Sequence, residues 1–222
     1  MTKEVFPGTC RGVCVKRLNS GFGAWHKRRC KAGFSLIELV LVVGIITVLA
    51  GLVLSTVSYA RKKGALARAE TEIAAMSAAI ENYKADNGIY PTNPDTNALN
   101  AQTLGNPCGY RAASLYLYEQ LSGDVNANFQ PTARSYFTFK PNMLGTSPTT
   151  TIDTCGNTLT PATVSYIRDP FGNIYGYSTI DNPVANPNPN PGYNPTFDLW
   201  STASLINTVP SAADQNLWIK NW

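Results

Sequence analysis

A long run of apolar residues dominates the first third of the chain. Between Leu39 and Ala60, twenty-two successive residues carry no formal charge, and most of them are Leu, Val, Ile, Ala or Gly. A helix rises about 1.5 Å per residue, so about twenty such residues cross the hydrocarbon core of a bilayer. The run is also longer than the apolar core of an ordinary signal peptide. We therefore predict a membrane-spanning helix here.

Beyond this run, apolar positions recur with the period of a helix that buries one face. They are spaced by three and four residues: Leu66, Ala69, Ile73, Met76, Ile80 and Tyr83. Charged residues, among them Glu70, Glu72 and Lys84, fall off this stripe. Asn87-Gly88 is typical of a C-terminal cap, and Pro91 prevents the helix from continuing. The pattern predicts one long helix, half in lipid and half packed on a head domain.

The rest of the chain alternates short segments rich in Tyr, Phe, Ile and Val with turn residues. Four strands are predicted: Ser135–Lys140, Val164–Arg168, Ile174–Ile180 and Thr196–Ser201. Ser114–Leu121 is expected to form a short helix, and residues 182–195 an Asn/Pro-rich loop. The predicted fold class is α+β, with a long N-terminal helix packed on a small antiparallel sheet.

The charge is distributed unevenly along the chain. Residues 1–33 hold eight Lys/Arg and one Glu, a net of +7, whereas the other 189 residues hold ten basic and thirteen acidic side chains, a net of −3. A basic patch can indicate nucleic-acid binding. Here the patch stops at the apolar run, so we interpret it as the cytoplasmic flank of a membrane helix and expect no nucleic-acid partner. Arg61-Lys62-Lys63, which follows the apolar run, opposes this orientation, but residues 1–33 carry more positive charge.

Glu38 lies at the entrance of the apolar run, where a carboxylate is unfavourable unless it is compensated. A carboxylate at the headgroup boundary, favoured by the helix N-terminus, is the simplest explanation. Its context, Lys31-Ala-Gly-Phe-Ser-Leu-Ile-Glu38, closely resembles the processing signal of type IV pilins and type II secretion pseudopilins. The resemblance implies that a prepilin peptidase cuts between Gly33 and Phe34, that Phe34 is N-methylated, and that Glu38 becomes the fifth residue of the mature chain.

This resemblance also implies how the chain assembles. In lipid, the Glu38 carboxylate of one subunit can meet the free N-terminal ammonium of a neighbour. This pairing offsets the desolvation costs of the two charges and specifies the axial register between the subunits. The implied organisation is a basic leader that is removed (1–33), a transmembrane and assembly half of the helix (34–60), an amphipathic half (61–90) and an exported head (91–222).

Further segments resemble the major pseudopilins of type II secretion. They are Tyr83–Thr92, Asp169–Tyr177, Phe197–Ser201 and Ile219–Trp222. The resemblance covers roughly residues 33–92 and 164–222, whereas residues 93–163 form an enlarged region that matches nothing specific.

The function expected from this resemblance is that of a structural subunit of a type II secretion pseudopilus. Its implied partners are further copies of itself, the prepilin peptidase, an inner-membrane assembly platform and minor pseudopilins. The chain would cross the inner membrane once with its head in the periplasm. No catalytic constellation is visible, and His26, the single histidine, lies in the leader. A type IV pilin for adhesion, motility or DNA uptake is the alternative, and a membrane-tethered periplasmic binding module is the alternative from another class.

The five cysteines fall into two groups. Cys108 and Cys155 lie beyond the membrane helix and are expected to form a disulfide in an oxidising compartment; two free buried thiols are the alternative. The others lie in the leader as Cys10, Cys14 and Cys30 around His26. That spacing formally suits a Cys3His zinc site, but the implied cleavage removes this segment.

The segment between Trp200 and Trp222 leaves two interpretations open. By resemblance to major pseudopilins it would bind calcium, with Asp198, Asp214, Asn207 and Asn216 as oxygen donors. The acidic cluster typical of such a loop is largely missing. The other interpretation is a loop closed by apolar packing of Leu205, Ile206, Leu217 and Trp218, with no cofactor required.

Overall fold

The computed structural model describes residues 34–180, 192–203, 205 and 209–222. The chain divides into two units, Met1–Leu49 and Ala50–Trp222. The leader with its cysteines, His26 and Gly33 lies outside the described residues, as do Ile206, Asn207 and residues 181–191 of the Asn/Pro-rich loop.

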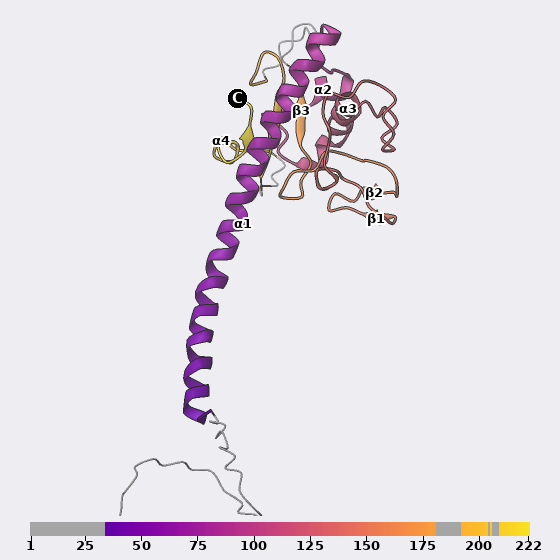
Figure 1. Cartoon of the computed structure of the whole chain (residues 1–222). Coiled ribbons are helices and arrows are strands. Elements are labelled where there is room, and N and C mark those ends of the chain that lie inside the picture. Colours follow the sequence, from indigo (N-terminus) through magenta and orange to yellow (C-terminus); the bar gives the residue numbers. More distant parts are fainter. Residues whose placement is uncertain (1–33, 181–191, 204, 206–208) are drawn as a thin grey trace, which may run out of the picture. The chain divides into compact units, whose positions relative to one another are not determined.

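The predicted long helix is confirmed. Helix α1 covers Leu36–Asn87, a length of 52 residues (Figure 1). It ends where predicted, because Gly88 takes a φ of 79° and its N–H donates to the Lys84 carbonyl at 2.7 Å. In the unit 50–222, the apolar stripe is the buried face: Ala69, Ile73, Met76 and Ile80 are each at most 4% exposed.

The head contains a three-stranded antiparallel sheet in the order β3-β4-β5. Its strands are β3 (Gly176–Ser178), β4 (Asp198–Ser201) and β5 (Ile219–Lys220). Tyr177 pairs with Leu199, and Trp200 pairs with Lys220. The α+β fold is therefore confirmed, and two of the predicted strands contain β3 and β4, although the observed strands are shorter.

Two strand predictions were wrong. Ser135–Lys140 forms no strand, because the N–H groups of Tyr136 and Phe137 both donate to the Leu121 carbonyl instead of to a ladder. Val164–Arg168 contributes only two isolated bridges, Leu144 with Ile167 and Arg168 with Ile174. The backbone of this segment instead pairs with the loop around Gly145, which donates to the Tyr166 carbonyl and accepts from Ser165.

The enlarged region forms short elements around the same core. They are α2 (Pro94–Ala98), η1 (Pro107–Tyr110), α3 (Arg111–Ser122), η2 (Pro141–Met143) and the hairpin of β1 (Thr151–Ile152) with β2 (Thr158–Leu159). The predicted helix at 114–121 is the central part of α3. Figure 1 shows α3 and β3 beside the C-terminal part of α1.

Two adjoining apolar clusters make up the interior of the head. The first joins the α1 stripe to Leu117 and Leu121 of α3 and to Tyr175 and Tyr177. The second is built around Trp200, with Tyr110, Ile174 and Trp218. A last short helix, α4 (Ala212–Gln215), precedes β5.

Candidate functional site

The apolar part of α1 carries the residues that the sequence predicts for processing and assembly. Phe34 precedes the helix and is 83% exposed, and Glu38 lies in the first turn. The helix N-terminus favours a negative charge at this position. Glu38 takes part in no ion pair within the part of the chain that the structure describes.

The side chains around this part of α1 are apolar and exposed on every side. From Leu36 to Val53, all Leu, Ile and Val side chains are at least 46% exposed. By length and composition, α1 is the one candidate membrane span among the described residues. An apolar helix surface that lacks a polar face needs lipid or other helices around it. The segment therefore anchors the chain in a membrane.

In the head, α1 and the residue that precedes β3 are joined by a buried polar contact that the sequence pattern did not reveal. Glu72 lies off the apolar stripe but is only 9% exposed. Its carboxylate accepts a hydrogen bond from the Tyr175 hydroxyl at 2.8 Å and from the Arg68 Nε at 2.6 Å. Burial, followed by the nearby Glu72 charge, raises the pKa of Tyr175, so Tyr175 remains a neutral donor.

Asp169 organises the turn that precedes β3. One carboxylate oxygen accepts from the N–H groups of Phe171 at 2.9 Å and Asn173 at 2.8 Å, and the other accepts from the Ser201 hydroxyl of β4. Burial raises the pKa of Asp169 to about 6, although these hydrogen bonds oppose the shift. The Asp169–Tyr177 segment thus connects a turn to the sheet edge. Its resemblance to pseudopilins could have drawn attention to this aspartate.

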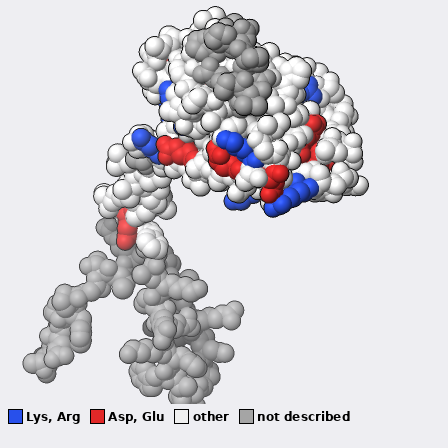
Figure 2. All heavy atoms as spheres, turned by 90° about the horizontal axis from the view of Figure 1, so that it is seen from above, with Lys and Arg blue, Asp and Glu red and all other residues white. Residues whose placement is uncertain are grey.

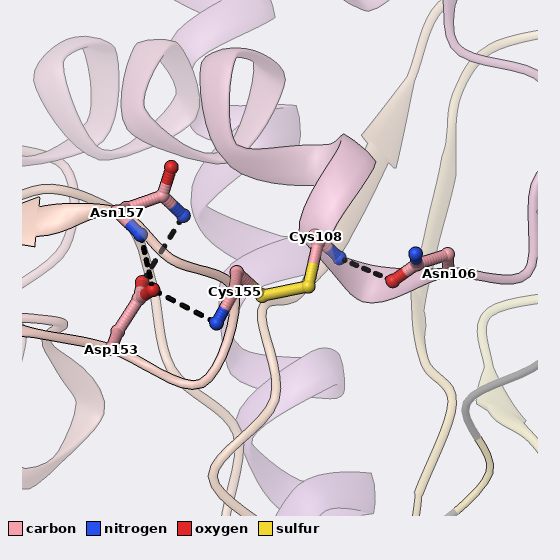
Figure 3. Close-up of a disulfide and its surroundings, with 5 residues drawn as sticks. All are labelled: Asn106, Cys108, Asp153, Cys155 and Asn157. Atoms are coloured by element: carbon pink, nitrogen blue, oxygen red, sulfur yellow. Dashed lines mark hydrogen bonds between the residues drawn. A yellow bond between two sulfur atoms is a disulfide. The ribbon is translucent and has the colours of Figure 1, made fainter.

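Cys108 and Cys155 form the predicted disulfide, which joins η1 to the turn of the β1–β2 hairpin (Figure 3). Their Cα atoms lie 5.3 Å apart. Hydrogen bonds shape both ends: the Asn106 side chain accepts from the Cys108 N–H at 3.0 Å, and Asp153 accepts from the Cys155 N–H at 2.9 Å. The bond thus joins two segments of the enlarged region, the one around η1 and the β1–β2 hairpin.

The carboxylates considered for calcium each act within their own turn. Asp198 accepts from the N–H groups of Tyr193 at 3.0 Å and Asn194 at 2.8 Å. Asp214 forms a capping box with Ser211 at the start of α4, and Asn216 caps its end. Among the described residues, no group of three or more His, Cys, Asp or Glu side chains comes close enough together to hold a metal.

Apolar packing in the same segment is only partly as predicted. Trp218 is buried, with its ring stacked 6.3 Å from that of Trp200, and Leu205 packs on the same cluster. Leu217 is instead 63% exposed. It turns outward because Trp218, the next residue, leads into β5 and points into the core.

Residues 28–54 match the prokaryotic N-terminal methylation motif. This range includes the predicted processing site and Glu38, the residue predicted to act in assembly. The chain is also similar to curated proteins named type II secretion system core protein G. The Pseudomonas aeruginosa protein is 39% identical over 82 residues, 36% of this chain and 58% of the relative. The Vibrio cholerae protein is 38% identical over 66 residues, 30% of this chain and 45% of the relative.

Over these stretches the chain is similar to core proteins G of type II secretion systems, and its residues 28–54 match the methylation motif. The Escherichia coli core protein G is also similar, at 40% identity over 60 residues, 27% of this chain and 41% of the relative. The chain spans about half the length of these curated relatives. No solved structure matches it significantly.

Proposed function

We propose that this chain is a structural subunit of a type II secretion pseudopilus. One observation carries the proposal: a helix segment that is apolar and exposed on all sides, Leu36–Val53, within a methylation motif at residues 28–54. Such a surface suits a lipid environment before assembly and a bundle of identical helices afterwards. Similarity to several core proteins G of type II secretion systems supports the same function.

Processing precedes assembly in this proposal. A prepilin peptidase removes residues 1–33 by cutting between Gly33 and Phe34, and Phe34 is then N-methylated. Cutting creates a free ammonium four residues before Glu38. The Glu38 carboxylate of one subunit pairs with the ammonium of a neighbour. The axial register between subunits therefore depends on a contact that the uncut precursor cannot make.

The proposed orientation places the basic leader in the cytoplasm and the head in the periplasm. The net charge of +7 on residues 1–33 supports it. The Cys108–Cys155 disulfide supports it as well, because disulfides persist in oxidising compartments such as the periplasm. Partners in this setting are the peptidase, the assembly platform, minor pseudopilins and other copies of the chain.

Substitution of Glu38 tests the assembly mechanism. Glu38→Ala should leave membrane insertion and cleavage intact but abolish filaments that can be sheared from cells. Removing one partner of a buried ion pair costs roughly 3–5 kcal/mol. Glu70→Ala is the matched control, because Glu70 is an exposed glutamate on the same helix outside the apolar run. Filament yield and the membrane pool are measured together, and normal filaments from Glu38→Ala would refute the register role.

Two measurements test the processing and the biological role. N-terminal sequencing and intact mass of the membrane-extracted chain should show a methylated Phe34 as the first residue; any other start contradicts the processing step. Deleting the gene in its own host should abolish export of secreted enzymes and leave surface adhesion and motility unchanged. Loss of motility with normal secretion would instead indicate a type IV pilin.

A further inference from the structure

A groove of about 400 Å³ lies beside α1 in the unit 50–222. Tyr59, Lys62, Lys63 and Leu66 of α1 line it, together with Leu205 and Leu217 of the C-terminal segment. Residues from the start of the amphipathic half of α1 and from the end of the chain thus form one concave surface. Neither the processing site nor the Glu38 contact involves it.

The groove exposes side chains that are unfavourable in water. Leu217 is 63% exposed and Tyr59 is 67% exposed. Large apolar side chains gathered in one hollow, with cationic groups among them, indicate a binding surface rather than scattered surface residues. The chemistry of the lining shows which kind of molecule would cover it.

The position of the groove along the chain points to the bilayer. Tyr59 is the last residue but one of the charge-free run that ends at Ala60, and Lys62 and Lys63 follow within three residues. At 1.5 Å per residue, these positions lie about 5 Å or less from the end of the span along the helix axis. Tyr at this depth is typical of the membrane–water interface, and Lys side chains there extend toward lipid headgroups.

The charges of the groove fit an anionic headgroup. Arg61, Lys62 and Lys63 are three successive cations, and none of them forms a salt bridge within the described ranges. The nearest acidic residues along α1 are Glu70 and Glu72, and Glu72 is occupied by Arg68 and Tyr175. Figure 2, a view from above the head, shows mostly uncharged surface, with positive and negative side chains side by side across the lower part of the head and others at its two sides.

We propose that this groove binds an anionic phospholipid of the membrane in which the chain is anchored. Lys62 and Lys63 hold the phosphate, while Tyr59, Leu66 and Leu217 cover the start of the acyl chains. The contact would hold the head against the membrane surface in the pool of subunits that awaits assembly. This proposal rests on the membrane anchoring that the proposed function includes, but not on secretion or on the Glu38 contact.

The test uses the processed chain, Phe34–Trp222, at one copy per lipid nanodisc. A Leu217→Cys variant carries an environment-sensitive fluorophore, since Cys108 and Cys155 are joined in the disulfide. The discs contain phosphatidylcholine alone or phosphatidylcholine with phosphatidylglycerol. In discs with phosphatidylglycerol, we expect the emission of the label to shift to shorter wavelength and the label to be protected from a water-soluble quencher. The same label at Ile152→Cys is the control, because Ile152 is 73% exposed in β1 and should remain accessible in both discs.

Charge removal tests the role assigned to the lysines. Lys62→Gln with Lys63→Gln should reduce the ratio of protected to accessible label about fivefold for each lysine. Lys140→Gln removes an exposed lysine elsewhere on the head and should leave the ratio unchanged.

Other outcomes overturn the proposal in distinguishable ways. A label that stays accessible in discs that hold the chain refutes lipid binding but leaves the anchor intact. Equal protection without phosphatidylglycerol refutes the role of the lysines. Protection that arises only with several chains per disc assigns the groove to a second copy. A chain that elutes without the discs refutes the membrane anchor, and with it the proposed function.

Discussion

Removal of the Cys108–Cys155 disulfide should destabilise the head by a large fraction of its total stability. The two cysteines are separated by 47 residues in the sequence. In the chain-entropy treatment, cross-linking a loop of this length lowers the entropy of the unfolded chain enough to stabilise the fold by about 4 kcal/mol at 25 °C. Domains have total stabilities of about 5–15 kcal/mol.

The structure indicates where this stabilisation acts. The β1–β2 hairpin has two residues in each strand, and Ile152 is 73% exposed, so little apolar burial holds β1 on the head. On the other side of the bond, η1 contributes Tyr110, which is fully buried against Trp200 with ring centroids 5.1 Å apart. Without the bond, the hairpin should detach first and remove Leu159 of β2 from the second apolar cluster, while Tyr110 and Trp200 remain packed together.

The assay is urea unfolding of the processed chain in detergent, followed by fluorescence of the head tryptophans. With an m-value of roughly 2 kcal/mol/M, Cys108→Ala with Cys155→Ala should lower the midpoint by about 2 M. Reductant should lower the wild-type midpoint equally and leave the double variant unchanged. A midpoint shift below about 0.5 M, or a double variant that still responds to reductant, would refute this reasoning.

Three further predictions concern the head. The folded-state pKa of Asp169 is raised to about 6, above its unfolded value, so the free energy of unfolding should rise by roughly 2–3 kcal/mol as the pH falls from about 6 to 4. Thermal melts across that pH range should show this dependence in the wild type and not in Asp169→Asn. Ile80→Ala should cost about 2–5 kcal/mol in urea unfolding, whereas exposed Ile152→Ala should change stability by less than about 0.5 kcal/mol. Millimolar Ca²⁺ should not raise the melting temperature relative to EGTA, because Asp198 and Asp214 are used in backbone turns; a clear rise would establish a calcium site.

Local signals were sufficient for α1 and its ends. The apolar run, the stripe at spacings of three and four, and the Asn87-Gly88 stop depend only on residues close together along one helix, so a periodic pattern predicts them. The methylation motif is local as well, because it consists of contiguous residues, 28–54. The Cys108–Cys155 pairing could be predicted because only two cysteines follow the membrane helix.

The strands show where local signals fail. Tyr136, Phe137 and Phe139 have strong strand preference, yet their segment packs as an aromatic cluster, with the rings of Phe137 and Phe139 4.7 Å apart. A strand exists only if a partner backbone lies beside it. Here the nearby acceptor is a single carbonyl, that of Leu121 at the end of α3. Which backbone lies beside which is a property of the folded chain.

By itself, the sequence determined the membrane anchor, the long helix, the processing motif and the α+β class, because each follows from side-chain periodicity or from contiguous residues. Only the tertiary structure decided the buried Glu72–Tyr175 contact, the burial that raises the pKa of Asp169 and the groove between α1 and the C-terminal segment. These features join residues that are far apart in the sequence; Glu72 and Tyr175, for example, are separated by 103 positions. Their chemistry depends on burial and proximity, which arise when distant segments pack together.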